Sequence, residues 1–438
     1  MIPFILAVRF GGLLFSCSYG MIAAMFEKWF RKASKRLYLD YAAATPLLPA
    51  VREMTEGLSS VMYGNPSAIH QEGADARNIV EDARHMVART LGVRPVEVFF
   101  TASGTESNNL AIAGVIEAKR GQGTEYRDMT VLTTALEHPS VSAVLQLYAK
   151  RGVSVVHMPI DETGQIVMRD CADLLTEQVV LVTTAYANSE IGVVQPISRM
   201  GRMIRKYNTE HQTNIVFHVD AAQAPLWLPC QLHTLKVDIL SLDAGKCHGP
   251  KGVGVLVKRN DVMIEPLVLG GGQESGLRAG TENTFGIMGA AIALKDADAE
   301  RDRRVAAAHR LSVALWNELQ TMVPTAVWNG PVLPTSLDSS SLQRLPHNVH
   351  ISVPGLDTEY ATIYLDQQGI ACSTKSACSG AGGGESAVIA AISGDSARSA
   401  ATLRFTIDPQ LSVDDMKRVA RALADCVALQ QTIDAPTK

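Results

Sequence analysis

The sequence is poor in the residues that mark several classes of protein. Only 7 of its 438 residues are cysteine, an odd number, and no two of them form a Cys-x-x-Cys pair. A disulfide framework is therefore not expected, and neither is a structural zinc site or any other metal site. The chain carries 40 Lys and Arg against 44 Asp and Glu. Because there is no basic excess to neutralise a phosphate backbone, a nucleic acid is not expected as its main ligand.

The residues that are present favour a large globular protein. Hydrophobic residues make up 47% of the chain and charged residues 19%, which excludes a disordered protein, a collagen and a coiled coil. The length predicts two or three domains, and no internal repeat is visible. The low cysteine content indicates a reduced, intracellular protein, so we predict a cytoplasmic location.

Residues 1–35 form an apolar and then basic extension. Residues 2–26 are apolar except for Arg9, and basic side chains follow at Lys28, Arg31, Lys32, Lys35 and Arg36. Three interpretations stay open. The segment is a membrane anchor that keeps the rest of the chain on the cytoplasmic side, a signal peptide, or sequence upstream of a true start at Met21 or Met25.

From about residue 95, strand-like and helix-like segments alternate. Such alternation predicts an α/β domain, here residues 36–290, with a mainly parallel sheet covered by helices. In such a sheet, ligands bind beyond the carboxyl ends of the strands. The predicted strands are 96–101, 130–134, 153–158, 179–184, 215–219, 239–242 and 253–257.

After Gly286 the pattern changes to that of a smaller α+β domain, which we place at residues 291–438. The segment 36–50 is a candidate for packing on this second domain. The predicted elements are a long helical region at 287–322 broken by charge-rich turns, strands at 347–353 and 402–407, and helices at 358–368 and 413–430.

Two motifs follow predicted strands and suggest an anion site and a buried acid. Gly104 and Thr105 open a helix, where backbone N–H groups and a hydroxyl suit a phosphate, although a plain helix cap has the same pattern. Asp220 ends a buried strand, where a carboxylate needs a cation or several donors. A protonated pyridine nitrogen is one such cation, and a helix cap is the alternative.

A lysine follows the next predicted strand. Lys246 in a pocket of low dielectric could lose its proton and form a Schiff base with an aldehyde. Taken alone, the motif favours an ordinary surface lysine, and Lys251 in its Pro-Lys-Gly turn is a rival. Together with the phosphate and acid motifs, however, a lysine here describes a pocket for pyridoxal 5′-phosphate.

At this point the chain resembles the cysteine desulfurases of the class V aminotransferase group, which have the fold-type I architecture. The resemblance covers about residues 36 to 430 in one order. Its motifs are 38–46 (YLDYAAATP), 64–70 (GNPSAIH), 100–108 (FTASGTESN), 137–138 (EH), 190–192 (EIG), 218–223 (HVDAAQ), 249–252 (GPKG), 270–272 (GGG), 278–283 (RAGTEN) and 376–378 (SAC).

The resemblance implies contacts with the ring of pyridoxal 5′-phosphate. Lys246 would form the Schiff base, Asp220 would pair with the pyridine nitrogen, and His138 would stack on the ring and move protons. Gln223 would bind the phenolic oxygen. Ser189 stands where the family has a second asparagine, so one contact with the cofactor is shortened.

The resemblance also implies the phosphate, substrate and sulfur sites. Gly104 and Thr105 would hold the phosphate, and Thr281 would reach it from the partner subunit of a homodimer. Arg404 would bind the substrate carboxylate as a bidentate fork, with Asn65 as a second substrate-binding residue. The nucleophile that accepts sulfur would be Cys378, in a glycine-rich loop that suits an exposed, reactive thiolate. Cys171, Cys230, Cys372 and Cys426 are interpreted as structural.

The chain departs from the family's pattern around these sites. Asp243 and Gly245 replace a serine and a histidine before the lysine, so a carboxylate stands where a phosphate is expected, and two anions repel each other. Ser275 replaces an arginine, and Lys375 adds a cation near Cys378. We expect the cofactor to bind with weaker affinity or altered kinetics.

The sequence therefore predicts a cysteine desulfurase that converts L-cysteine to L-alanine and leaves a persulfide on Cys378. The sulfur would pass to an acceptor protein for Fe–S cluster assembly or tRNA thiolation. Two alternatives stay open: another class V reaction, such as that of a lyase or an aminotransferase, and a catalytically weakened scaffold of the same fold. A preference for selenocysteine over cysteine is also left open.

Overall fold

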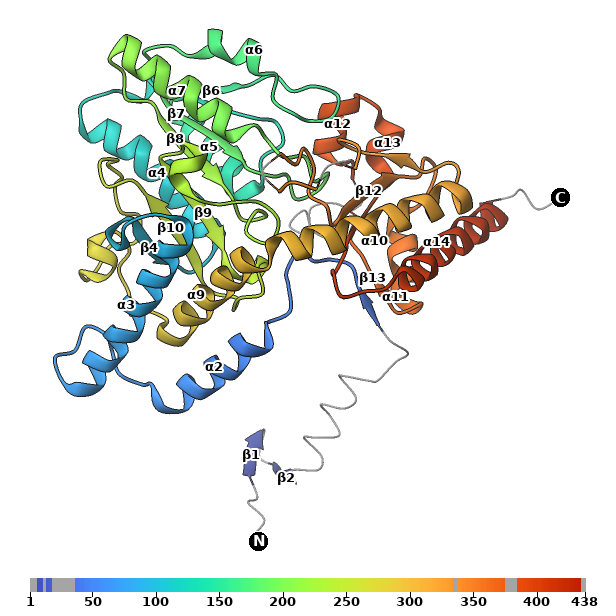
Figure 1. Ribbon diagram of the computed structural model, residues 1–438, viewed down its shortest axis with the longest axis horizontal. Helices are drawn as coiled ribbons and strands as arrows, with labels where there is room; N and C mark the ends of the chain where they lie inside the picture. The colour runs from blue at the N-terminus through green and yellow to red at the C-terminus, as the bar shows by residue number, and fades with distance from the viewer. Residues whose placement is uncertain are drawn as a thin grey trace.

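The main body of the chain is built on a seven-stranded, mostly parallel sheet (Figure 1). The computed structural model describes residues 6–10, 13–17, 36–333, 337–339, 341–374 and 384–434. In this sheet, β10 runs antiparallel to both of its neighbours, β4 and β9, whereas the other pairs of strands are parallel. The strands lie in the order β4 (Val98–Thr101), β10 (Gly254–Lys258), β9 (Ile239–Asp243), β8 (Val216–Asp220), β7 (Val179–Ala185), β5 (Thr130–Thr133) and β6 (Ser154–His157).

Helices bury both faces of this sheet. Side chains alternate along each strand, so that Phe99 packs into one apolar cluster and Phe100 into the other. Leu181 and Val182 divide in the same way. One face packs against α4 (Gly104–Gly121) and α5 (Pro139–Lys150), and the other against α3 (Gln71–Leu91), α7 (Ile197–His211) and α9 (Thr284–Ala299). The predicted α/β fold class is confirmed.

The starts of α4 and α5 are fixed by capping side chains. Ser103 accepts a hydrogen bond from the backbone N–H of Glu106 at 3.1 Å. His138 accepts one from the N–H of Ser140 at 3.1 Å, and Pro139 follows it as the first helical residue. These caps satisfy amides that have no partner within the helix, and they place both helix starts at the carboxyl edge of the sheet.

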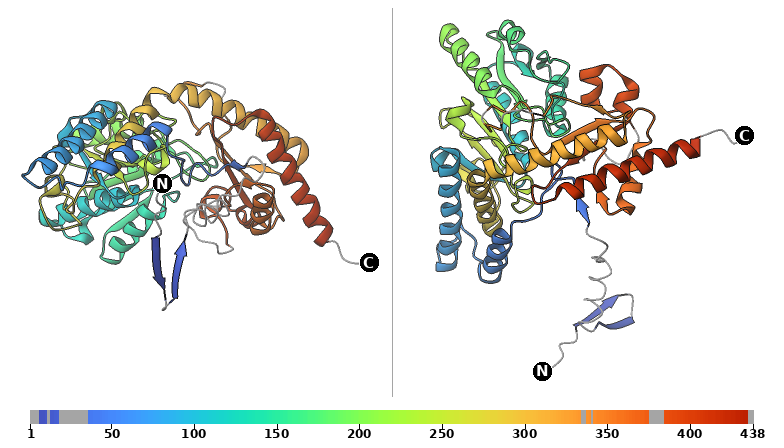
Figure 2. Two further views of the ribbon diagram at one scale, coloured as in Figure 1. Left: turned by 90° about the horizontal axis from the view of Figure 1, so that it is seen from below. Right: turned by 45° about the vertical axis from the view of Figure 1, so that its right-hand side comes forward.

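A second, smaller sheet has its own apolar core. Strands β11 (Val327–Trp328), β12 (Asn348–Ser352) and β14 (Thr402–Thr406) pack with α10 (Arg301–Met322), α11 (Thr358–Gln367) and α14 (Val413–Asp434). The long helix α10 extends from the end of α9 to β12 and α14, as Figures 1 and 2 show. The boundary between two domains at residue 290 stays a prediction.

The segment that enters the main body crosses from the small sheet to the large one. Strand β3 (Leu37–Tyr38) pairs with β13 (Ile370–Ala371), and Leu37 and Leu39 belong to the core of the small sheet. The chain then continues into α2 (Pro49–Val61), which packs on α9. The other α-helices of the described residues are α6 (Met168–Cys171), α8 (Leu232–Leu235), α12 (Ala387–Ser393) and α13 (Ser396–Ala400).

Of the N-terminal extension, the structure describes only two strands. β1 (Leu6–Phe10) and β2 (Leu13–Cys17) pair antiparallel. The rest of residues 1–35 lies outside the described part, and with it most of the segment for which an anchor, a signal peptide or an earlier start was proposed. Among the described residues, no helix combines the length and the apolar character needed to cross a membrane.

Candidate active site

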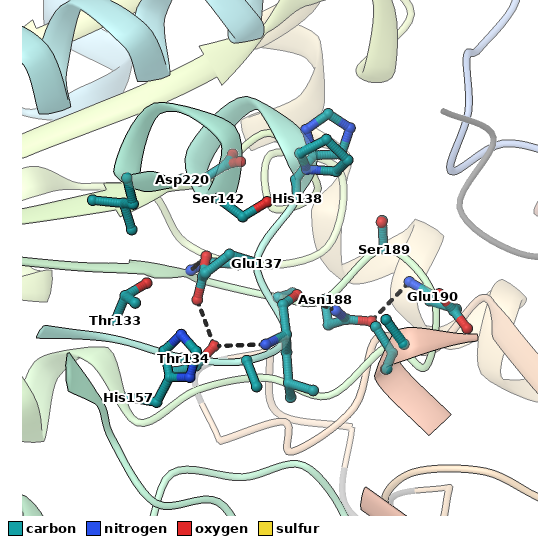
Figure 3. A pocket seen from close by; sticks show the side chains of 18 of the residues that line it. Thr133, Thr134, Glu137, His138, Ser142, His157, Asn188, Ser189, Glu190 and Asp220 are labelled. Atoms are coloured by element: carbon teal, nitrogen blue, oxygen red, sulfur yellow. Dashed lines mark hydrogen bonds between the residues drawn. The ribbon is translucent and has the colours of Figure 1, made fainter. Parts of the chain in front are cut away.

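A cavity of about 540 Å³ lies at the carboxyl edge of the parallel strands (Figure 3). The ends of β5, β7 and β8 and the turns that follow β5, β7 and β9 contribute to its walls. Residues 385–388, from the start of α12, close it on the side of the small sheet. Its polar lining residues include Thr134, Glu137, His138, Asn188, Ser189, Glu190, Asp220, Gln223 and Lys246.

Asp220 is the last residue of β8 and is held by two hydrogen bonds. Its Oδ1 accepts from the backbone N–H of Ala222 at 2.9 Å, and its Oδ2 accepts from the side-chain amide of Asn108 at 2.8 Å. The same amide of Asn108 donates to the hydroxyl of Ser140 at 2.9 Å. The carboxylate is therefore fixed in position, and only 8% of the residue is exposed. The sequence analysis did not single out Asn108, although its place in the first turns of α4 could have suggested it.

His138 faces the cavity as a neutral imidazole. Burial lowers the pKa of His138, and the charge of Lys246 lowers it further, while the carboxylates of Asp220 and Asp243 act in the opposite direction. Because the Nδ1 atom of the ring accepts from the N–H of Ser140, the proton of the neutral ring belongs on Nε2.

Of the lysines that the structure describes, Lys246 lines the cavity. It follows β9 in a tight turn, is half-buried, and lines the cavity with Asp220 and His138. Lys251 is exposed and does not line the cavity. Of the two lysines that the sequence offered, only Lys246 has the position that a Schiff base with a bound aldehyde requires.

Glu137 is a cavity residue to which the sequence analysis gave no role. Its carboxylate accepts from the Thr134 hydroxyl at 2.6 Å and from the N–H of Ala185 at 2.8 Å, and Figure 3 shows the first of these bonds. Burial raises the pKa of Glu137 to about 7, and the charge of Asp220 acts in the same direction. The available signal was its position directly before His138.

At the start of α4, the side chain of Asp243 fills the place where a phosphate was expected. Its Oδ2 accepts from the backbone N–H of Gly104 at 3.2 Å, and its Oδ1 accepts from the N–H of Gly245 at 2.9 Å. Thr105 is exposed beside this contact, and Thr281 lies exposed in a loop that does not line the cavity. The carboxylate of Asp243 thus accepts a hydrogen bond from the backbone N–H that we had assigned to the phosphate of the cofactor.

The two predicted substrate-binding residues lie outside the cavity wall. Arg404 is buried in β14, where its Nη2 pairs with Asp40 at 2.7 Å and its Nη1 donates to the carbonyl of Ser189 at 3.0 Å. Because Ser189 lines the cavity, Arg404 is one residue removed from it. Asn65 is exposed, and its side chain accepts from the N–H of Ser67 at 3.0 Å.

Gln223 lines the cavity, but its amide donates to the carbonyl of Ala42 at 2.8 Å.

Cys378 and Lys375 lie outside the described residues. The chain is described again from Gly384 onward, and the residues just after it line the cavity.

The other cysteines among the described residues from position 36 onward have thiols that burial keeps protonated. Cys171, Cys230, Cys247 and Cys426 are buried, and Cys372 is half-buried. Burial raises the pKa of Cys372 to about 12 and that of Cys171 to about 11. These five thiols therefore lack the thiolate character of a nucleophile.

The cavity fits one half of a pyridoxal 5′-phosphate molecule better than the other. A fixed carboxylate, a neutral imidazole and a lysine converge on one space, as a pyridine ring with an aldehyde requires. The phosphate end does not fit in the same way, since Asp243 already occupies the N–H of Gly104. Three groups that suit the ring thus converge in the cavity, whereas a competing anion lies at the expected phosphate position.

Fold and site together define a protein of the fold-type I class that binds pyridoxal phosphate. More closely, the chain belongs to the family described as Aminotransferase class-V, whose pattern matches residues 37–419. The members of this family depend on pyridoxal phosphate.

Individual relatives agree with this assignment. The chain is 33% identical over 399 residues to a protein of Dictyoglomus turgidum named cysteine desulfurase IscS, covering 91% of this chain and 96% of that one. It is similar to a solved structure titled NifS-like protein, with a TM-score of 0.80, 31% identity, and coverage of 90% of this chain and 100% of the other. A structure titled SspA in complex with cysteine matches with a TM-score of 0.68 and 28% identity, covering 85% and 99% of the two chains.

Proposed function

We propose that the protein is a pyridoxal phosphate-dependent cysteine desulfurase. The reaction would break the C–S bond of L-cysteine, release L-alanine, and leave the sulfur as a persulfide on the thiol of Cys378. The observation that carries the proposal is the convergence of Lys246, Asp220 and His138 in one cavity at the carboxyl edge of the sheet. The relatives named cysteine desulfurase and the structure solved with cysteine support L-cysteine as the substrate.

The side chains of the cavity supply binding and proton transfer, while the cofactor when bound supplies an electron sink. Asp220, fixed by Asn108 and Ala222, would present a negative charge to a ring nitrogen. By resemblance, His138 would stack on the ring and move protons to or from the substrate. Lys246 would provide the amine that holds the aldehyde.

Arg404 is proposed to bind the substrate carboxylate at the edge of the cavity. It is already paired with Asp40, so a substrate would have to share or replace that partner. We further propose a homodimer in which Thr281 of each subunit reaches the cofactor of the other, and a protein that accepts sulfur from Cys378. Fe–S cluster assembly and tRNA thiolation are the two outlets that the resemblance suggests.

The test is an absorbance spectrum of the purified full-length protein with pyridoxal phosphate, before and after L-cysteine is added. We expect a visible band from the lysine-bound cofactor, a change of that band with cysteine, and release of alanine. Lys246→Ala should lack the band, and Lys251→Ala, the matched lysine outside the cavity, should keep it. Loss of the band in Lys251→Ala alone would contradict the assignment of Lys246.

A second variant separates sulfur transfer from cofactor chemistry. Cys378→Ser should still change colour with L-cysteine but should release no sulfide and carry no persulfide by mass spectrometry. Turnover of an amino acid without a persulfide in the wild type would favour a lyase or an aminotransferase. Failure of the wild type to bind cofactor at all would favour a scaffold of the same fold.

A further inference from the structure

The carboxylate of Asp243 is bound like an anion at the start of α4. It receives hydrogen bonds from the N–H groups of Gly104 and Gly245, at 3.2 Å and 2.9 Å. Gly104 is the first residue of an 18-residue helix, where unpaired amides and the helix dipole favour negative charge. The helix start therefore already holds the kind of group that it would offer to a phosphate.

There is little space for a second anion at this helix start. A Cβ atom placed on Gly104 would lie 3.0 Å from the Cβ of Asp243 and 3.1 Å from its Oδ2, so the two residues are in close contact. A phosphate that used the N–H of Gly104 would have to displace the carboxylate. It could not lie beside the carboxylate without strong repulsion.

Among the described residues, no lysine or arginine forms an ion pair with the carboxylate of Asp243. Arg278 lies close to the start of α4, but its guanidinium is paired with Glu106 at 2.8 Å. The histidine that the family places before the lysine is Gly245 here, and it has no side chain to contribute. Lys246 is near Asp243, but we assign its amine to the aldehyde.

We propose that Asp243 is an internal anion that replaces the contact between the cofactor's phosphate and α4, so that the protein discriminates only weakly between pyridoxal phosphate and unphosphorylated pyridoxal. This inference rests on the proposed function, because it assumes that the cavity binds a pyridoxal ring. Contacts with the pyridoxal ring and the bond to Lys246 would then provide most of the protein's affinity for either ligand. The neutral hydroxymethyl group of pyridoxal can donate a hydrogen bond to Asp243, whereas a phosphate is repelled by it.

The test measures the binding of pyridoxal phosphate and of pyridoxal to four full-length proteins by equilibrium dialysis. The proteins are the wild type, Asp243→Ser, Asp243→Asn, and Asp173→Asn, which removes the same charge from an exposed position away from the cavity. The quantity measured is the affinity for pyridoxal phosphate divided by that for pyridoxal. Effects of a variant on the ring contacts cancel in this ratio. The tendency of free pyridoxal to mask its aldehyde is the same for all four proteins, so it cancels when their ratios are compared.

We expect both Asp243 variants to raise this ratio by about tenfold or more, because they remove a charge next to the phosphate. Asp173→Asn should leave the ratio unchanged. Lowering the pH from 8 toward 6, where a phosphate ester with a second pKa of about 6 gains a proton, should raise the ratio more in the wild type than in Asp243→Ser.

Equal ratios in the wild type and in both Asp243 variants would overturn the inference while leaving the proposed function intact. Binding of neither ligand by any of the folded proteins would overturn the proposed function itself. Asp243→Asn keeps the shape of the side chain and can keep one of the two hydrogen bonds, so it serves if Asp243→Ser does not fold. Thermal denaturation of each protein shows which of them are folded.

Discussion

Glu137 and Asp220 line the same cavity, and burial makes it costly for the carboxyl group of Glu137 to be charged. Asp220 has two donors and an expected cationic partner in the ring nitrogen. Glu137 also has two donors, yet its pKa is raised to about 7 from a usual 4.5. At neutral pH, Glu137 is therefore divided between a neutral and a charged form, so its charge responds to pH in this range.

This shift predicts a dependence of stability on pH. Below 4.5, Glu137 is protonated in both folded and unfolded chains. Between 4.5 and about 7 the folded chain keeps a proton that the unfolded chain loses, so stability falls as the pH rises. The side chain of Glu137→Gln does not ionise. Compared with this variant, the wild type should lose about 3 kcal/mol of unfolding free energy from pH 4.5 to pH 8. Urea denaturation of both proteins at several pH values measures this difference, and parallel pH profiles would contradict it.

At the scale of elements, the cavity depends on how closely β10 approaches the turn between β4 and α4. Gly254, the first residue of β10, pairs with Thr101 on one side and with Asp243 on the other. A Cβ atom at Gly254 would lie 2.3 Å from the carbonyl oxygen of Ser103 and 2.4 Å from the Oγ1 of Thr101. The backbone can approach this closely only because the residue is glycine.

Gly254→Ala should therefore push β10 away from the start of α4. Overpacking of this kind costs about 1–3 kcal/mol, and we expect a loss of stability in that range together with weaker cofactor binding. Gly57→Ala is the matched control, since that glycine lies inside α2 with nothing within 4 Å of its added Cβ. The control should gain about 0.5–1 kcal/mol. Equal denaturation midpoints for the two variants would contradict the predicted contact.

At the scale of the whole molecule, large apolar side chains remain exposed on the loops near the predicted partner contact. Ile69 is 99% exposed, Tyr63 83% and Leu269 79%. The Gln273 amide lies 3.5 Å from the hydroxyl of Ser67, so the two loops that carry these side chains lie side by side. An exposed apolar patch of this kind is typical of a protein–protein interface.

We predict that this surface joins two copies of the chain, with Thr281 in the same region. Ile69→Asp combined with Leu269→Asp should shift the protein from dimer to monomer in light scattering, because charges would be buried in the interface. Ile433→Asp, a matched change at an equally apolar, 64% exposed position on α14, should leave the dimer intact. A wild-type monomer that binds the cofactor fully would contradict the shared site.

The sequence by itself determined the fold class and the positions of the residues at the strand ends. The strand pattern and the helix starts are local signals, and they placed Asp220 and Lys246 at one edge of a sheet before any strand order was known. His138 was assigned through the resemblance. The chain's departure at Asp243 was also visible as a carboxylate in an unusual position. Such properties follow from neighbours in the chain and from the periodicity of burial.

Only the tertiary structure decided which distant groups meet. The insertion of β10 between β4 and β9 brings Asp243 to the N–H of Gly104, 139 residues away in the sequence. Strand β14 lies beside the N-terminal segment, so Arg404 pairs with Asp40, which is 364 residues away in the sequence. The pKa of Glu137 likewise depends on burial by several elements at once. Strand order and desolvation are properties of the assembled chain, and for that reason no local pattern carried them.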